Sequence, residues 1–213
     1  MRPELVLWDW NGTLLDDVDL CIDALNRLLA RHGYPQRYGP AGYRAIFGFP
    51  IIDYYQRAGF DFARHPFAEL AEDYMQDYIP ASEACPLAKG AADCLAALQN
   101  AGVRQVVLSA SPISTLEQQV RARGVRSRFE RLLGLDDIYA RSKVELGLAF
   151  LQEGGFDPAH AVLIGDTLHD AEVAAALGVR CLLQTGGHQD AATLAKAGVP
   201  VYPDLPSAVA TLL

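Results

Sequence analysis

Three short apolar runs stand out along the chain, at Leu5–Trp8, Val106–Leu108 and Ala161–Ile164. Their hydrophobic residues are continuous rather than alternating, which is typical of strands covered on both faces. A helical pattern follows each run, and two weaker strands are predicted at Arg180–Leu183 and Val199–Tyr202. This alternation predicts an α/β fold of three layers, in which a Rossmann-like parallel sheet lies between helices.

The three main runs each end in a small or acidic polar residue, namely Asp9, Ser109 and Gly165-Asp166. In parallel sheets of this kind, ligands bind outside the carboxyl ends of the strands. We therefore expect these polar residues to meet at one edge of the sheet, although they lie far apart in the sequence.

The distance along the chain from Trp8 to Val106 is far longer than the roughly thirty residues that a βαβ unit needs. The surplus predicts an inserted, all-helical cap domain at residues 16–84. Residues 1–15 and 85–213 would then form the α/β core.

The first helix of the insert has clear signals. Acidic residues from Asp16 to Asp19 favour the positive end of a helix dipole, an apolar stripe follows, and Gly33 ends the pattern. Further helices are predicted at Ile51–Ala58 and Phe67–Tyr78. The tyrosines of the insert are expected to pack its own small core.

Composition narrows the class of protein. The 213 residues are 51% hydrophobic and carry a net charge of -8, with 26 acidic against 18 basic residues. An apolar chain of this length can bury a core, and its acidic surplus argues against nucleic acid or an anionic membrane as the main partner. Four widely spaced cysteines and no signal-peptide or membrane-span pattern lead us to expect a cytoplasmic protein with reduced thiols.

The segment that follows the first strand carries the first candidate chemistry. Asp9 is a carboxylate at a strand end, and the Asn11-Gly12-Thr13 turn presents backbone N–H groups of the kind that bind phosphate oxygens. Asp166 and Asp170 follow a second strand. Carboxylates gathered at strand ends suit a hard divalent ion such as Mg²⁺.

Lys143 adds an independent indication. Ser142 and Glu145 fit a capping box, which places Lys143 at the first helical position. A lysine there opposes the helix dipole at a cost of a few tenths to about 1 kcal/mol. The position is better explained if Lys143 faces the carboxylates and a phosphate.

Polar motifs at these strand ends and at the helix start form a set of four in chain order. They are Asp9-x-Asn11-Gly12-Thr13, Ser109, Lys143, and Gly165-Asp166-x-x-x-Asp170. This set resembles the four motifs of the haloacid dehalogenase superfamily of phosphatases, and most closely its phosphoglycolate-phosphatase-like branch with a helical C1-type cap. The resemblance spans almost the whole chain.

The resemblance implies a Mg²⁺-dependent phosphatase that acts on a small phosphorylated metabolite. Asp9 would be the nucleophile and form an aspartyl-phosphate, Ser109 would bind a phosphoryl oxygen, and Lys143 would offset its charge. The metal ligands implied are Asp9, the backbone carbonyl of Asn11, Asp166 and Asp170. The substrate contacts expected are Gly12, Thr13, Ser109 and, from the cap, Arg44, for which a plain surface position is the competing interpretation.

Asn11 departs from the family pattern, in which this position is normally a second aspartate that protonates the leaving alcohol and activates water. An amide cannot transfer that proton at neutral pH. General acid–base catalysis is typically worth about 10²–10⁴ in rate. We therefore expect slowed turnover, with Asn11 still contributing its carbonyl to the metal.

Neighbouring polar residues receive structural interpretations. Ser111 before Pro112 suits a helix N-cap, His169 is expected to be a solvated neighbour, and Gly186-Gly187-His188 reads as a turn after a strand.

Three other functions remain open at this point. Asn11 favours a non-catalytic, phosphate-binding regulatory protein with the same fold. A phospho-receiver module would place its aspartate after a later strand, and a carbon–halogen hydrolase would not need Asp166 and Asp170. The expected partner is a small molecule rather than nucleic acid or a membrane, and the chain is expected to be a monomer or homodimer.

Overall fold

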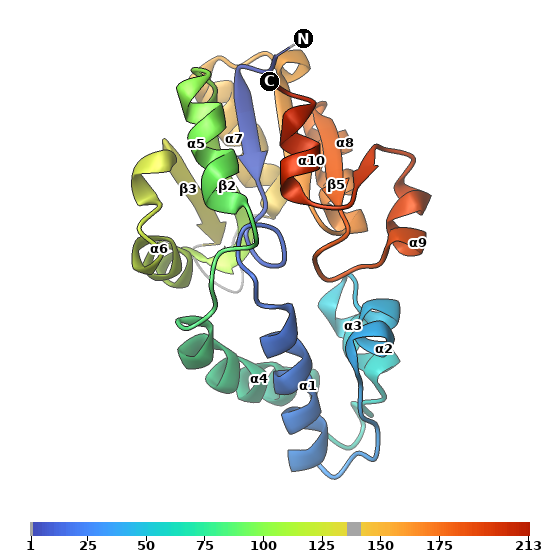
Figure 1. Ribbon diagram of the computed structural model, residues 1–213. Coiled ribbons are helices and arrows are strands. Elements are labelled where there is room, and N and C mark those ends of the chain that lie inside the picture. The colour runs from blue at the N-terminus through green and yellow to red at the C-terminus, as the bar shows by residue number, and fades with distance from the viewer. Residues whose placement is uncertain (1, 136–141) are drawn as a thin grey trace.

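The computed structural model describes residues 2–135 and 142–213, and within them a single parallel sheet has six strands (Figure 1). Their order across the sheet is β3-β2-β1-β4-β5-β6, so β1 lies between β2 and β4. The strands are β1 (Leu5–Trp8), β2 (Arg104–Pro112), β3 (Arg131–Leu135), β4 (Ala161–Gly165), β5 (Arg180–Gln184) and β6 (Val201–Tyr202).

Helices cover both faces of this sheet, because side chains on successive residues of a strand point to opposite sides. Val6 and Trp8 of β1 pack in the same core as α5, α6 and α10, whereas Leu5 and Leu7 pack with α7 and α8. The predicted three-layer α/β fold is therefore confirmed. The helices of the core are α5 (Ala91–Asn100), α6 (Ile113–Ala122), α7 (Lys143–Gly154), α8 (Leu168–Leu177), α9 (Ala191–Leu194) and α10 (Leu205–Ala210).

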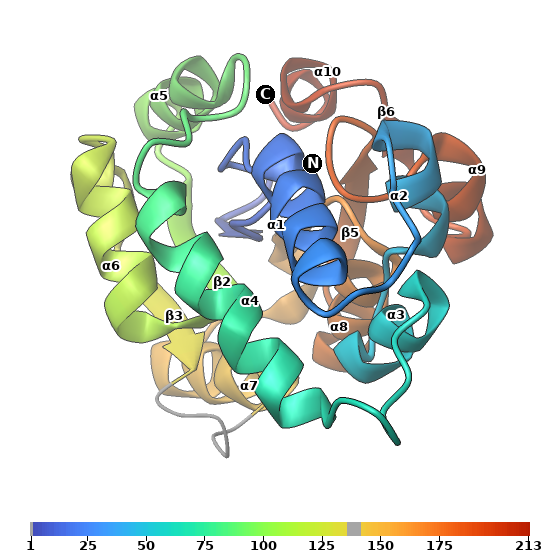
Figure 2. The ribbon, with the colours of Figure 1, turned by 90° about the horizontal axis from the view of Figure 1, so that it is seen from below.

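Four helices lie beyond the carboxyl ends of the strands, within the segment 16–84 that the sequence assigns to the cap (Figures 1 and 2). They bury a separate hydrophobic cluster that includes Leu25, Leu28, Tyr43 and Leu70, and tyrosines contribute to it as expected. The helices are α1 (Val18–Arg31), α2 (Pro40–Ile46), α3 (Ile51–Ala58) and α4 (Phe67–Ser82).

Several elements differ from the sequence prediction. β3 was not predicted, because it is a short edge strand whose apolar residues are interrupted by Gly134. α2 was also missed, since Tyr43 is its only buried residue and no apolar stripe marks it. α4 extends to Ser82 and contains Pro80, beyond the predicted end at Tyr78.

None of the helices in the described part of the chain is both long and apolar enough to cross a membrane.

A buried chain of hydrogen bonds joins the core to the end of α4. Trp10 Nε1 donates to Gln119 Oε1 at 2.8 Å, and Gln119 Nε2 donates to Ser82 Oγ at 2.7 Å. Trp10 and Ser82 are fully buried and Gln119 is nearly so. Gln119 thus satisfies polar groups on both sides of the connection between cap and core.

We expect Gln119→Met to destabilise the protein by about 1–3 kcal/mol, because it keeps the side-chain length but leaves the buried indole N–H of Trp10 and the hydroxyl of Ser82 with one partner fewer. The matched control is Gln118→Met, one residue earlier on the exposed face of α6, which should change stability by less than about 0.5 kcal/mol. Urea unfolding followed by circular dichroism measures both. Equal stability of the two variants would show that this hydrogen-bond chain is not needed.

Candidate active site

The sheet order brings the three predicted strand ends together. Trp8 of β1 is in register with Val107 of β2 on one side and with Ile164 of β4 on the other. Asp9 and Asp166 therefore directly follow adjacent strands at one edge of the sheet, and Ser109 lies beside them within β2, which continues to Pro112 instead of ending before Ser109 as predicted. This is the point where the strand order reverses, which is where open α/β sheets bind ligands.

Asp9, Asp166 and Asp170 form an acidic cluster there. One carboxylate oxygen from each lies within 4.8 Å of the others. Burial raises the pKa of Asp9 to about 7, against the opposing effect of Lys143, and burial likewise raises the pKa of Asp166 to about 6. Both shifts reflect the cost of gathering buried negative charge.

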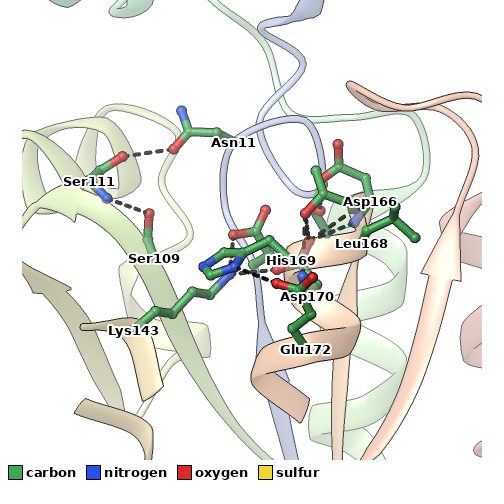
Figure 3. A network of polar contacts seen from close by, with 12 residues as sticks. Asn11, Ser109, Ser111, Lys143, Asp166, Leu168, His169, Asp170 and Glu172 are labelled. Atoms are coloured by element: carbon green, nitrogen blue, oxygen red, sulfur yellow. Dashed lines mark hydrogen bonds and ion pairs between the residues drawn. The ribbon is translucent and has the colours of Figure 1, made fainter. Parts of the chain in front are cut away.

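Lys143 supplies a buried cation to this cluster (Figure 3). Its Nζ donates to Asp9 Oδ1 at 2.7 Å and to Asp170 Oδ1 at 2.6 Å. Burial opposes the charged form, but Asp170 and Asp9 raise the pKa of Lys143 above its ordinary value. The predicted capping box of Ser142 and Glu145 is present, and it starts α7 so that Lys143 stands at its first position.

Asp170 contacts both the start of α8 and Lys143. Its Oδ2 accepts hydrogen bonds from the backbone N–H and the hydroxyl of Thr167 at the start of α8, whereas its Oδ1 faces Lys143. Burial raises the pKa of Asp170, but Lys143 outweighs this effect and lowers it overall.

The acidic cluster fits a hard divalent cation. Lys143 contacts two of the three carboxylates, Asp9 and Asp170, so carboxylates outnumber the lysine, and carboxylate oxygens are the ligands that Mg²⁺ prefers. Asp166 is held by the hydroxyl of Thr13 at 2.7 Å and the backbone N–H of His188 at 2.6 Å. A Cβ on Gly187 would lie 2.1 Å from Asp166 Oδ2, so only glycine permits this close packing.

The amide of Asn11 is fully engaged in hydrogen bonds (Figure 3 shows the contact with Ser111). Its Oδ1 accepts from Ser111 Oγ at 2.7 Å, and its Nδ2 donates to Asp17 Oδ2 at 2.9 Å and to Tyr78 Oη at 2.7 Å. The position therefore requires an acceptor on one side and a donor on the other. A carboxylate at position 11 would face the carboxylate of Asp17 without a proton between them.

The sequence did not reveal the roles of Asp17 and His188. Asp17 was interpreted as a helix-start residue, but its side chain makes no cap hydrogen bond and instead accepts from Gly12 N at 2.8 Å and Tyr78 Oη at 2.6 Å. His188 was interpreted as part of a turn, yet it is buried, with Nε2 at 3.6 Å from Asp17 Oδ1 and Nδ1 at 2.9 Å from Tyr43 Oη. Burial raises the pKa of Asp17, but His188 and its other partners lower it overall.

Three predicted substrate contacts do not line the cavity described below. Gly12 donates its N–H to Asp17, and Thr13 uses its hydroxyl on Asp166, so both position carboxylates. Arg44 Nε donates to the backbone carbonyl of Gly187 at 2.9 Å. These three residues support the site from outside.

The prediction that Ser111 is a helix N-cap is wrong. Ser111 lies in β2, and α6 begins two residues later with Pro112 as its N-cap. The Ser111 hydroxyl instead donates to Asn11. His169 is partly exposed, as expected, but it lines the cavity and stacks on Phe49.

A cavity of about 230 Å³ lies between core and cap. Its polar end comes from the core and contains the predicted nucleophile. The core residues there are Asp9, Asn11, Ser109, Ser111, Lys143, Thr167 and Asp170.

Comparison with known proteins identifies the family. A family model described as haloacid dehalogenase-like hydrolase matches residues 6–183. The chain belongs to the haloacid dehalogenase-like hydrolases. This match confirms the resemblance predicted from the four motifs.

Individual proteins are similar to this chain over most of its length. The phosphoglycolate phosphatase of Pseudomonas putida is 28% identical over 97% of this chain and 76% of its own length. The tyrosine-protein kinase PtkA of Mycobacterium tuberculosis is 28% identical over 93% of this chain and 68% of its own. A haloacid dehalogenase-like hydrolase of Streptococcus pneumoniae shares the fold, with a TM-score of 0.84 at 20% identity over 99% of both chains. The relatives named phosphoglycolate phosphatases support the predicted phosphoglycolate-phosphatase-like branch and, with the family match, a phosphoric monoester hydrolase.

We expect Asn11→Asp to destabilise the protein by about 1–3 kcal/mol at pH 8, because it places a partly buried carboxylate in contact with the buried carboxylate of Asp17. Their mutual repulsion raises the folded-state pKa of the pair above the unfolded value of about 4. Stability is therefore retained at low pH and lost as the pH rises through the raised pKa, so the deficit should be smaller at pH 5 than at pH 8. Chemical denaturation at both pH values measures this.

The double variant Asn11→Asp/Asp17→Asn is the control. It exchanges donor and acceptor within the same contact, and should recover most of the stability lost at pH 8. An Asn11→Asp protein as stable as the parent at pH 8 would contradict the conclusion that Asp17 selects the amide.

Proposed function

We propose that this haloacid dehalogenase-like hydrolase is a Mg²⁺-dependent phosphatase of small phosphorylated metabolites, in which Asp9 is the nucleophile and Asn11 slows turnover. The observation that carries the proposal is the contact of Lys143 with Asp9 at the polar end of the cavity. A buried cation beside a strand-end carboxylate both holds the nucleophile and attracts a phosphate dianion.

The first step forms a bond between an Asp9 carboxylate oxygen and phosphorus, while the bond from phosphorus to the ester oxygen breaks. The leaving oxygen takes the electron pair of that bond. Ser109 lies at the same end of the cavity, where its hydroxyl suits a phosphoryl oxygen, and Lys143 offsets the charge on the phosphoryl group.

Mg²⁺ would be held by Asp9, Asp166, Asp170 and the backbone carbonyl of Asn11. When bound, it neutralises phosphate charge, so that the anionic Asp9 can approach an anionic substrate. The excess of carboxylates over Lys143 supports this assignment.

The second step is the hydrolysis of the aspartyl-phosphate by water, which returns the Asp9 carboxylate and releases inorganic phosphate and a proton. In the family pattern the residue at position 11 accepts that proton. The Asn11 amide cannot, and each of its polar atoms is already engaged. This step should therefore be the slow one.

The alternative of a non-catalytic, phosphate-binding regulatory protein is not favoured. It needs phosphate contacts but no nucleophile, whereas the contact of a strand-end carboxylate, Asp9, with the buried Lys143 supports a nucleophilic role for Asp9. The named relatives include phosphoglycolate phosphatases, which supports a small phosphorylated substrate.

We expect a burst of p-nitrophenolate from p-nitrophenyl phosphate in a rapid-mixing experiment with Mg²⁺, of about one equivalent per enzyme. Steady release should follow at a rate about 10²–10⁴ below the burst, the factor that general acid–base catalysis contributes. A chelator should remove both phases. Asp9→Asn, which keeps the shape of the side chain, should remove the burst.

Two results would contradict this proposal. A linear time course with fast turnover would mean that another residue supplies the base. An unchanged burst in Asp9→Asn would exclude Asp9 as nucleophile.

A further inference from the structure

The cavity has two chemically unlike ends. The core supplies charged and hydroxyl groups at the phosphate end, whereas the cap supplies a wall of mainly aromatic and aliphatic side chains around the leaving group. This wall is made by Phe47, Phe49, Ile51, Tyr74, Met75 and Tyr78.

The cap brings no cation to this wall. All of residues 16–84 are described, and no lysine or arginine among them lines the cavity. The two arginines nearest in sequence to the wall use their Nε atoms on backbone carbonyls, Arg44 on Gly187 and Arg57 on Ile46. Asp17 is the only charged cap residue at the cavity, and it is an anion. A second anionic group on a substrate would therefore find no partner from the cap.

One of the two phenol hydroxyls of the wall is committed to other protein groups. The hydroxyl of Tyr78 donates to Asp17 and accepts from Asn11, so this residue offers the cavity its ring rather than its oxygen. A polyhydroxylated leaving group would gain little here. Burial of apolar surface is the main interaction that the cap can provide.

The rings of the wall are held in stacked arrangements. Phe47 stacks on His188 with centroids 4.6 Å apart and 26° between the planes, and Phe49 stacks on His169 at 4.5 Å and 28°. Tyr74 lies nearly parallel to Tyr78, at 6.0 Å and 12°. Aromatic rings prefer offset-stacked or edge-to-face neighbours, which such a wall offers to one more ring.

Asn11 constrains the leaving group independently of the wall. Because no carboxylic acid stands at this position, the ester oxygen must depart without receiving a proton from it. A phenolate does so far more readily than an alkoxide, since a phenol such as tyrosine has a pKa of about 10.

We infer that the substrates of this site are phosphate monoesters of small, uncharged phenols. This inference rests on the proposed function and specifies its leaving group. In the first step the phosphorus–oxygen bond to the aryl oxygen breaks, its electron pair leaves with the phenolate, and Asp9 takes the phosphoryl group. The volume of about 230 Å³ is below the roughly 300–1,000 Å³ of sites for drug-sized ligands, which fits a single ring.

The test compares two substrates whose leaving phenolates have similar basicity, phenyl phosphate and 4-carboxyphenyl phosphate. The full chain is mixed with each in the presence of Mg²⁺, and the second-order rate constant of the burst is measured. We expect at least about a tenfold advantage for phenyl phosphate, because the added carboxylate meets an apolar wall. 2-Phosphoglycolate, an alkyl ester that also carries a carboxylate, should react more slowly than either.

A variant then tests whether the cap wall causes this preference. Met75→Lys places a cation in the wall and should shift the ratio of the two aryl substrates by at least about tenfold toward the carboxylated one. The matched control is Gln76→Lys, which adds the same charge to the exposed neighbouring position of α4, outside the cavity. It should shift the ratio by less than about twofold.

Binding of non-hydrolysable analogues gives a readout that does not depend on catalysis. Calorimetry with Mg²⁺ should show phenylphosphonate binding at least about tenfold more tightly than phosphonoacetate. Equal reactivity of both aryl substrates, or a preference that Gln76→Lys changes as much as Met75→Lys, would overturn the inference while the burst itself upholds the proposed function. No burst with any ester, together with preferred binding of phenylphosphonate, would overturn the proposed function but retain the aromatic selectivity of the cavity.

Discussion

The contact of one buried lysine with two buried aspartates is the interaction on which this site depends. Lys143 lies between Asp9, at the end of the central strand, and Asp170, in the first turn of α8. Without it, three carboxylates would share a buried pocket that no other lysine or arginine among the described residues lines, a cost of several kcal/mol. The parallel order β2-β1-β4 and the capping box that starts α7 are what deliver these groups to one point.

The same charge balance explains why an amide is suited to position 11. Asp17 already contributes a buried carboxylate beside it, anchored by Gly12, Tyr78 and His188. An additional carboxylate at position 11 would have no counter-charge of its own. The amide of Asn11 removes that conflict by donating to Asp17, and in doing so it gives up the proton transfer that its place in the motif would otherwise provide. The amide of Asn11 therefore stabilises the buried carboxylate of Asp17, but in the proposed mechanism it also slows turnover.

The parts of the site that could be predicted from sequence are those fixed by local rules. Asp9, Ser109 and Asp166 each follow an apolar run, and parallel strand order brings the three to one sheet edge. Lys143 could be placed because it starts a capped helix. The roles of Asp17 and His188 could not be predicted, because they meet only when α1 and the loop after β5 approach each other. β3 was missed for a related reason, since an edge strand of five residues carries too little pattern.

The core and the cap each restrict the substrate, and both restrictions concern the leaving group on the ester oxygen. Asn11 leaves the ester oxygen to depart without a proton, which favours a stabilised oxyanion. The cap encloses that leaving group with rings and aliphatic side chains and, within the described residues, no basic side chain of its own. An aromatic ring satisfies both, since it delocalises charge from the oxygen and buries apolar surface against Phe47 and Tyr74. In the proposed mechanism, the amide at position 11 therefore narrows the range of substrates as well as slowing the reaction, and both effects favour the aromatic leaving group that the cap wall also favours.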